Sequence, residues 1–100
     1  MQISMTFRNM EATEAMKEMV REKVSRAKKY IQGPMEATVV LSVERHLHAC
    51  DVTINASGQT YKAAKETDDM YTSIDKVMDK IERQIDKSKG RARASRTSIS

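Results

Sequence analysis

The sequence predicts an α+β fold, in which a four-stranded and mainly antiparallel sheet carries two helices on one face. Three segments alternate apolar with polar residues, which is the period of a strand buried on one side. Two other segments repeat apolar residues every three or four positions, which is the spacing of an amphipathic helix. With a weaker strand before the second helix, the element order is β-α-β-β-β-α.

The first third of the chain is expected to form one strand and one helix. The strand covers residues 2–8, where polar residues separate the apolar side chains of Ile3, Met5 and Phe7. Thr13 can cap the N-terminus of a helix that runs to about Ile31, and Gly33 and Pro34 then prevent its continuation. The apolar stripe of this helix consists of Met16, Met19, Val20, Val24, Ala27 and Ile31.

The middle of the chain is expected to form three consecutive strands. Residues 37–45 and 48–56 both alternate in polarity, and the short connection between them favours a hairpin. A Ser-Gly pair at 57–58 is a second turn signal. Residues 59–65 follow as a weaker fourth strand.

The second helix has three distinct faces and extends over residues 68–90. Its apolar stripe consists of Ile74, Val77, Met78, Ile81 and Ile85. At about 100° per residue, a set of acidic side chains falls about 110° from the middle of this stripe, and a set of basic side chains falls roughly opposite it. We name the first set the acidic row (Asp75, Asp79, Glu82 and Asp86) and the second the basic row (Lys76, Lys80, Arg83 and Lys87). Asp68 and Asp69 suit the positive N-terminal pole of the helix, and Gly90 suits a left-handed C-terminal cap.

Length and composition favour one small domain. The 100 residues suffice for a single modest core, which we assign to residues 1–90, and the basic tail at residues 91–100 is expected to be disordered. No apolar run approaches the about 20 residues that span a bilayer, and no secretory signal precedes the first strand. The single cysteine, Cys50, cannot form an intramolecular disulfide. We therefore expect a cytoplasmic protein with no membrane partner.

The net charge of +4 is concentrated in the last quarter of the chain. Residues 76–100 contain eight basic and three acidic side chains, whereas residues 1–75 contain ten basic and eleven acidic ones. The second half of the first helix is also basic, with Arg21, Lys23, Arg26, Lys28 and Lys29. Such asymmetry suggests a polyanionic partner, most often nucleic acid. The alternative is a solvated helix followed by a disordered tail.

The residue types that perform catalysis are not arranged for it. His46, His48 and Cys50 occupy alternate positions, but a polar hairpin turn beside a small buried thiol explains them better than a metal site, because no second cluster supplies a fourth ligand. The sequence has no glycine-rich phosphate loop and no serine elbow. We therefore expect no enzyme activity, cofactor, metal or small-molecule substrate. Tyr30 and Tyr61 are predicted to pack in the core rather than to stack on bases.

The second helix carries the clearest family resemblance. Residues 69–75, Asp-Met-Tyr-Thr-Ser-Ile-Asp, and residues 79–89, Asp-Lys-Ile-Glu-Arg-Gln-Ile-Asp-Lys-Ser-Lys, resemble the ribosome hibernation promoting factors. Members of this family are also named ribosome-associated inhibitors and sigma-factor modulation proteins. The likeness covers most of the chain and includes residues 1–3, Glu22, Lys23, Tyr30, residues 39–44 and His48.

The resemblance implies a fold similar to that of double-stranded-RNA-binding domains. It also implies binding in the messenger and transfer RNA channel of the small ribosomal subunit, near the decoding centre. There the protein would silence translation during slow growth or stationary phase. Contacts of the family with ribosomal RNA would carry over to Lys23, Arg26, Lys80, Arg83, Lys87 and Lys89. Charge placement alone adds Lys28, Lys29 and Lys76.

The branch of the family and one other class of function stay open. A short basic tail without a second domain resembles the short hibernation factors, which promote inactive ribosome dimers together with a separate ribosome modulation factor. The tail differs from the longer extension of the inhibitor branch, and a truncated long form would look the same as a short one. The competing function is a protein-interaction module that modulates a transcription factor through its basic face.

Overall fold

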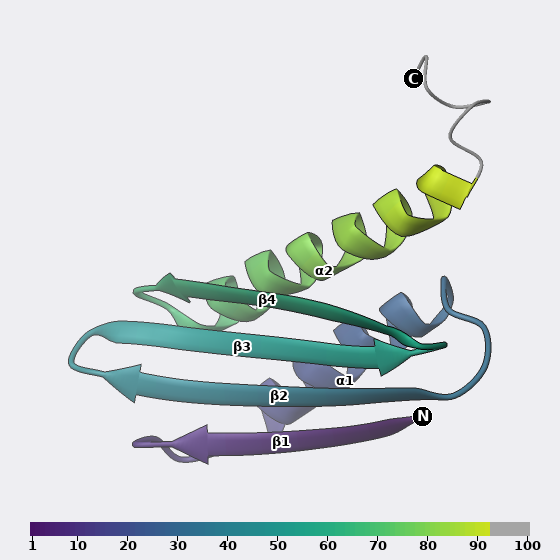
Figure 1. Cartoon of the computed structure of the whole chain (residues 1–100). Helices are drawn as coiled ribbons and strands as arrows, with labels where there is room; N and C mark the ends of the chain where they lie inside the picture. The colour runs from purple at the N-terminus through teal and green to yellow at the C-terminus, as the bar shows by residue number, and fades with distance from the viewer. Residues whose placement is uncertain (93–100) are drawn as a thin grey trace.

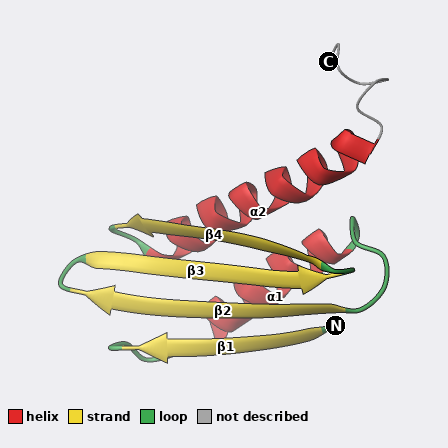
Figure 2. Cartoon of the chain, in the orientation of Figure 1, coloured by secondary structure: helices red, strands yellow, loops and turns green. Residues whose placement is uncertain are grey.

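The structure, a computed structural model, describes the backbone of residues 1–92 and the side chains of residues 1–88. Its elements follow the predicted order β-α-β-β-β-α (Figure 1). They are β1 (Gln2–Arg8), α1 (Glu14–Lys28), β2 (Met35–Glu44), β3 (Leu47–Ala56), β4 (Gln59–Thr67) and α2 (Met70–Ala92). Both helices lie on the same side of the sheet, so the predicted α+β architecture is confirmed (Figure 2).

The four strands lie in the order β1-β2-β3-β4, so neighbours in the sheet are also neighbours in the sequence (Figure 2). The crossover through α1 returns the chain to the same end of the sheet, which makes β2 parallel to β1. β2 pairs with β3, and β3 with β4, as antiparallel hairpins. In the second hairpin turn, φ is 52° at Ser57 and 76° at Gly58, as a type I′ turn requires. The sheet is therefore mainly antiparallel, as predicted.

The C-terminal end of α1 differs from the prediction. The helix ends at Lys28 instead of Ile31. The backbone amides of Lys29, Tyr30 and Ile31 each donate to the carbonyl oxygen three residues earlier, at 3.0 to 3.2 Å, so the last turn tightens into a 3₁₀-type turn. Ile31 still reaches the core and is only 8% exposed. Tyr30, which lies in this tightened turn just before Ile31, is exposed instead.

β4 is longer than predicted, whereas α2 has the predicted length of 23 residues but begins and ends two residues later. β4 extends to Thr67 because its last residues still pair with β3, where Thr67 lies opposite His48. α2 continues through Gly90 to Ala92, so the predicted cap at Gly90 is wrong. Glycine permits a left-handed cap but does not impose one, and a single glycine costs a helix only about 1 kcal/mol. The predicted disordered tail lies, from residue 93 onward, outside the described residues.

The core lies between the sheet and the two helices. The predicted apolar stripe of α2 is confirmed, because each of its five members is at most 2% exposed: Ile74, Val77, Met78, Ile81 and Ile85. α1 contributes Val20, Val24 and Ala27, while Met16 and Met19 are half-buried against this cluster. The sheet contributes the inward residues of β2 and β3: Met35, Ala37, Val39, Leu41, Cys50, Val52, Ile54 and Ala56. We call the opposite side of the sheet, which no helix covers, the open face.

Hydrogen bonds tie the first turn of α2 to the sheet. The Asp69 carboxylate caps the helix by accepting from the backbone N–H of Thr72 at 2.9 Å and from its hydroxyl at 2.8 Å. These bonds from Thr72 lower the pKa of Asp69. Ser73 is fully buried, and its hydroxyl donates to the carbonyl oxygen of His48 at 2.7 Å and lies 2.7 Å from the hydroxyl of Thr67. One buried hydroxyl therefore joins α2 to β3 and β4.

Replacing Ser73 by alanine is expected to lower the free energy of unfolding by about 1 to 3 kcal/mol, because the partly buried His48 carbonyl and Thr67 hydroxyl lose a partner. Urea unfolding followed by circular dichroism measures this change. Ser25→Ala is the control, since Ser25 is exposed on α1 and such substitutions usually change stability by less than about 0.5 kcal/mol. Equal effects of the two substitutions would show that the buried hydroxyl does not anchor α2.

Candidate nucleic-acid interface

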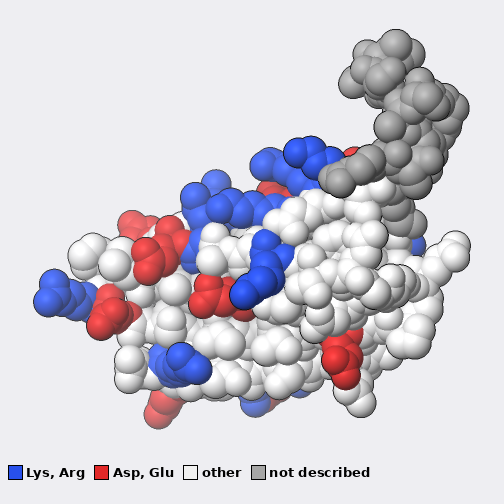
Figure 3. Space-filling view, viewed as in Figure 1, with Lys and Arg blue, Asp and Glu red and all other residues white. Residues whose placement is uncertain are grey.

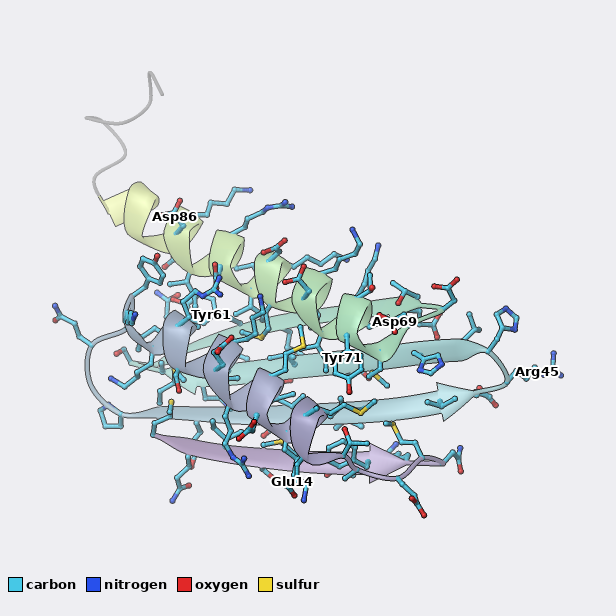
Figure 4. All side chains as sticks on the ribbon, turned by 180° about the vertical axis from the view of Figure 1, so that it is seen from behind. Glu14, Arg45, Tyr61, Asp69, Tyr71 and Asp86 are labelled. Carbon is cyan, nitrogen blue, oxygen red and sulfur yellow. The ribbon has the colours of Figure 1, made fainter. Side chains whose placement is uncertain are left out.

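Each of the three faces of α2 has a different environment. The apolar stripe and the hydroxyl of Ser73 are buried in the core. The acidic row faces α1, where Asp75 bonds to Lys23. The basic row faces solvent and the edge of β4, where Lys80 bonds to the carbonyl of Ala64. The view of the helical side shows α1 and α2 crossing the sheet, with Asp86 near one end of α2 and Tyr71 near the other (Figure 4). The three faces that the periodicity predicts are therefore present, and packing assigns a neighbour to each.

The basic row of α2 is a continuous exposed surface. Lys76, Lys80, Arg83 and Lys87 are all exposed and recur at steps of four, three and four residues. Positive side chains gather along the upper edge of the molecule, over α2, in the space-filling view (Figure 3). The Lys80 ammonium donates to the carbonyl oxygen of Ala64 at 3.2 Å, which places it at the free edge of β4. The side chain of Lys89, also predicted to contact RNA, lies outside the described residues.

β4 adds two lysines that the sequence patterns did not single out. Gln84 of α2 is held against this strand, because its amide nitrogen donates to the carbonyl of Lys62 at 2.6 Å and its amide oxygen accepts from the Lys62 N–H at 3.2 Å. Lys62 is exposed on the open face, opposite Thr53 of β3, and the half-buried Lys65 lies opposite the buried Cys50, on the side that the helices cover. In the sequence, both lysines lie in the weakly predicted fourth strand, and no motif or charge cluster marks them as binding residues. Only the packing of α2 against the edge of β4 brings this strand next to the basic row.

The predicted basic residues of α1 divide into free and bonded side chains. Arg26 and Lys29 are exposed at the C-terminal end of the helix. The Lys28 ammonium donates to the carbonyl oxygen of Ile31 at 3.3 Å, which caps the last turn. The Lys23 ammonium lies 2.7 Å from the Asp75 carboxylate, and the Lys23 side chain is only 14% exposed. Lys23 thus joins α1 to α2, and binding a phosphate would require it to share or break this ion pair.

An acidic groove separates the two basic surfaces. Asp79, Glu82 and Asp86 of the acidic row line a cavity of about 420 Å³ together with Tyr30 and Arg83. The prediction that Tyr30 packs in the core is wrong, because the tightened turn after α1 leaves it 47% exposed in this groove. Tyr61, by contrast, packs against the core as predicted (Figure 4). Basic surfaces thus lie on either side of an acidic strip.

The ion pair between Lys23 and Asp75 also predicts how stability responds to acid. The hydrogen bond from Lys23, followed by the charge of its ammonium, holds the pKa of Asp75 below its usual 3.8. A carboxyl whose folded pKa is lower than its unfolded pKa stabilises the fold above pH 3.8, and this contribution is lost as the pH falls through the folded value. Because the Asp75 side chain is 52% exposed, solvent screens the pair.

Asp75→Asn is therefore expected to flatten the loss of stability between about pH 5 and pH 2, and to lower stability at neutral pH by less than about 1 kcal/mol. Urea midpoints across this range measure both effects. Asp79→Asn is the matched control, because Asp79 is an exposed acid of the same helix that forms no ion pair among the described residues. An acid response of the Asp75 variant identical to that of the unmodified protein would contradict this role of the pair.

The histidines and the cysteine are not gathered into one site. His46 is exposed in the turn between β2 and β3, whereas Cys50 is buried under the helices. Burial raises the pKa of the Cys50 thiol to about 12, with a further contribution from the charge of Asp51. Within residues 1–88, no three His, Cys, Asp or Glu side chains are grouped closely enough to hold a metal ion. No helix in the described part is long and apolar enough to cross a membrane.

Known proteins match this chain over most of its length. The family model described as Sigma 54 modulation protein / S30EA ribosomal protein matches residues 3–93. A ribosome hibernation promoting factor of Escherichia coli strain K12 is 38% identical over 89 residues, which cover 89% of this chain and 94% of that protein.

Two solved structures share the fold. The N-terminal domain of Thermus thermophilus Protein Y superposes with a TM-score of 0.79 at 29% identity, covering 85% of this chain and 96% of that domain. A ribosomal subunit interface protein from Coxiella burnetii gives a TM-score of 0.78 at 28% identity, covering 90% of this chain and 99% of that protein. Both solved structures therefore share the β-α-β-β-β-α fold of this chain.

Proposed function

Because the chain belongs to the Sigma 54 modulation protein / S30EA ribosomal protein family, we propose that it is a ribosome hibernation factor. It binds the small ribosomal subunit in the messenger and transfer RNA channel, near the decoding centre, and silences translation in slow growth or stationary phase. The name of the Escherichia coli relative supports the hibernation role, and the name of the Coxiella burnetii protein supports contact with a ribosomal subunit. The expected site of action is the cytoplasm, where ribosomes are.

The observation that carries this proposal is the rigid, exposed basic row of α2. Its 12-residue span from Lys76 to Lys87 contains 11 steps, which correspond to about 16 Å along the helix at about 1.5 Å per residue. The helix cannot rotate away, because its apolar stripe is buried and Gln84 and Ser73 bond to the sheet. Phosphates of a folded RNA can therefore meet a row of cations whose order and direction are preset.

We propose that recognition depends on RNA shape and charge rather than on base sequence. Folded RNA displays phosphates and ribose hydroxyls across its grooves, and lysine and arginine side chains on a rigid helix match them without reading base edges. The acidic groove contributes by repelling phosphates from the space between the helices, so RNA is guided to the basic surfaces on either side. The most exposed predicted contacts are Arg26, Lys29, Lys76, Lys80, Arg83 and Lys87.

On α1, two predicted contacts have structural roles that limit their availability, and on α2 the exposed Lys80 ammonium also donates to the Ala64 carbonyl. Lys23 is paired with Asp75, and Lys28 caps the last turn of α1. We keep both as proposed RNA contacts, with a lower expected contribution from each than from the exposed residues. Lys89 is proposed from its place in the sequence. Promotion of ribosome dimers, with a separate ribosome modulation factor as partner, is the further part of this proposal.

Sedimentation with small ribosomal subunits through gradients of increasing salt tests the proposal. Cosedimentation is expected at low salt, and the logarithm of the affinity should fall linearly with the logarithm of salt concentration, by about 0.7 to 0.9 for each phosphate contact. Binding that did not change with salt would contradict a phosphate-based interface. Recovery only in ribosome-free fractions would favour the alternative, a module that modulates a transcription factor.

A further inference from the structure

The two edges of the sheet are protected to different degrees. At the β4 edge, Gln84 of α2 bonds to both backbone groups of Lys62, and Lys80 bonds to the carbonyl of Ala64. Side chains of α2 thus occupy hydrogen-bonding groups that another strand would need. At the β1 edge, no described residue outside β2 forms a hydrogen bond with the strand. β1 therefore presents an unpaired row of backbone donors and acceptors.

β1 also lacks the features that usually keep an edge strand from pairing. Its seven residues contain no proline, and it pairs with β2 without a bulge, from Gln2 opposite Glu36 to Arg8 opposite Ser42. No charged side chain points inward from the strand, and Arg8 at its end is its single charged residue. Natural edge strands commonly use one or more of these devices to prevent association. β1 is thus a regular strand that is open to pairing.

The inward side chains of β1 are incompletely buried. Ile3, Met5 and Phe7 are all half-buried, whereas the inward residues from Met35 to Leu41 of β2 are buried. The half-exposed row adjoins the core and packs against it. A further strand beside β1 would cover this apolar row, which adds a hydrophobic contribution to the backbone hydrogen bonds.

We propose that β1 is an interaction surface for a second copy of this chain, which adds its own β1 in the antiparallel direction and extends the sheet. With Met5 opposite Met5 of the second copy, all seven residues pair. Ile3 then faces Phe7 of the second copy on the inward side, and Ser4 faces Thr6 of the second copy on the open face. Arg8 faces the neutral Gln2, so no like charges meet. A strand that is self-complementary in both polarity and charge fits another copy of itself.

This dimer is expected to be weak and to depend on concentration. One pair of seven-residue strands buries less than the roughly 1,200 Å² of a standard stable interface. The surface is separate from the basic row on α2, so the inference does not depend on the proposed function. A dimer of this chain is also distinct from a dimer of ribosomes.

Two double variants test both the surface and its register. Ser4 and Thr6 are exposed on the open face, so substitutions there leave the core intact. In Ser4→Lys/Thr6→Lys, the proposed pairing places like charges directly opposite each other twice, which should weaken dimerisation by about tenfold or more. In Ser4→Lys/Thr6→Glu, the same pairing places opposite charges together, which should preserve or strengthen the dimer. Circular dichroism verifies that both variants are folded.

Sedimentation velocity from micromolar to millimolar protein measures the dissociation constants. Concentration-dependent dimers are expected for the unmodified chain and for the Lys/Glu variant, and a dissociation constant at least about tenfold higher is expected for the Lys/Lys variant. Amide NMR signals of β1 should shift with concentration more than those of β4. A chain that stayed monomeric at millimolar concentration would overturn the proposal. Equal dimerisation of all three proteins would place any interface elsewhere and overturn it too, and a monomeric Lys/Glu variant would overturn the register.

Discussion

The triple substitution Lys80→Ala, Arg83→Ala and Lys87→Ala is expected to weaken binding to the small ribosomal subunit by about tenfold or more at moderate salt, while leaving the fold intact. All three side chains are exposed on α2, and exposed substitutions usually change stability by less than about 0.5 kcal/mol each. If each side chain contacts one phosphate, the slope of log affinity against log salt should decrease by about two to three in total.

The acidic row of the same helix provides the matched control. Asp79→Asn, Glu82→Gln and Asp86→Asn remove the same number of charges from the same helix, and these three carboxylates form no ion pair among the described residues. Asp75 is left unchanged because its loss would also release Lys23. This control should preserve or modestly raise subunit binding, since it removes charges that repel phosphate.

Translation in a cell-free system gives the second readout for these two variants. The unmodified protein and the acidic-row variant should inhibit translation at similar concentrations, and the basic-row variant should need a much higher concentration. If the basic-row variant is folded by circular dichroism and still silences translation like the unmodified protein, the basic row is not the RNA-binding surface. If both variants behave like the unmodified protein, the charges of α2 serve solubility alone.

Ile81→Ala is expected to lower the free energy of unfolding by about 2 to 5 kcal/mol, because it leaves a cavity under α2. Ile81 is 0% exposed and lies in the middle of the apolar stripe, between Val77 and Ile85. For a domain of this size, at about 4 to 8 °C for each kcal/mol, such a loss corresponds to a decrease in the melting temperature of roughly 8 to 40 °C. It is a large fraction of the about 5 to 15 kcal/mol that stabilises a typical domain.

Ile81→Val is the control for this second prediction, because it removes one methyl group and should cost only about 0.5 to 1.5 kcal/mol. Thermal and urea unfolding measure both variants. Below its melting temperature, the alanine variant should still bind the small subunit, since Ile81 does not reach the surface. A stability loss below about 1 kcal/mol for Ile81→Ala would mean that α2 does not depend on this part of its stripe.

Local periodicity was sufficient to predict most of the fold. The apolar stripe of α2 was assigned residue by residue, because a helix turns by a constant angle and the burial of one face determines the others. The β2–β3 hairpin and the turn at Ser57 and Gly58 followed from alternation and from turn residues that tolerate positive φ. The exposure of the basic row followed from the same helical geometry. Its contact with RNA stays a prediction.

Contacts between elements decided what the periodicity could not. The ion pair of Lys23 with Asp75 joins residues 52 positions apart, and the bonds of Gln84 to Lys62 join residues 22 positions apart. No local sequence pattern predicts contacts between residues so far apart in the chain, because these contacts depend on how α1 and α2 lie across the sheet. Tyr30 is exposed because α1 tightens at its end, which a smooth helical projection does not anticipate. The sequence alone thus determined which faces each element has, and tertiary packing determined which neighbour each face meets, since side-chain pairing requires both partners in place.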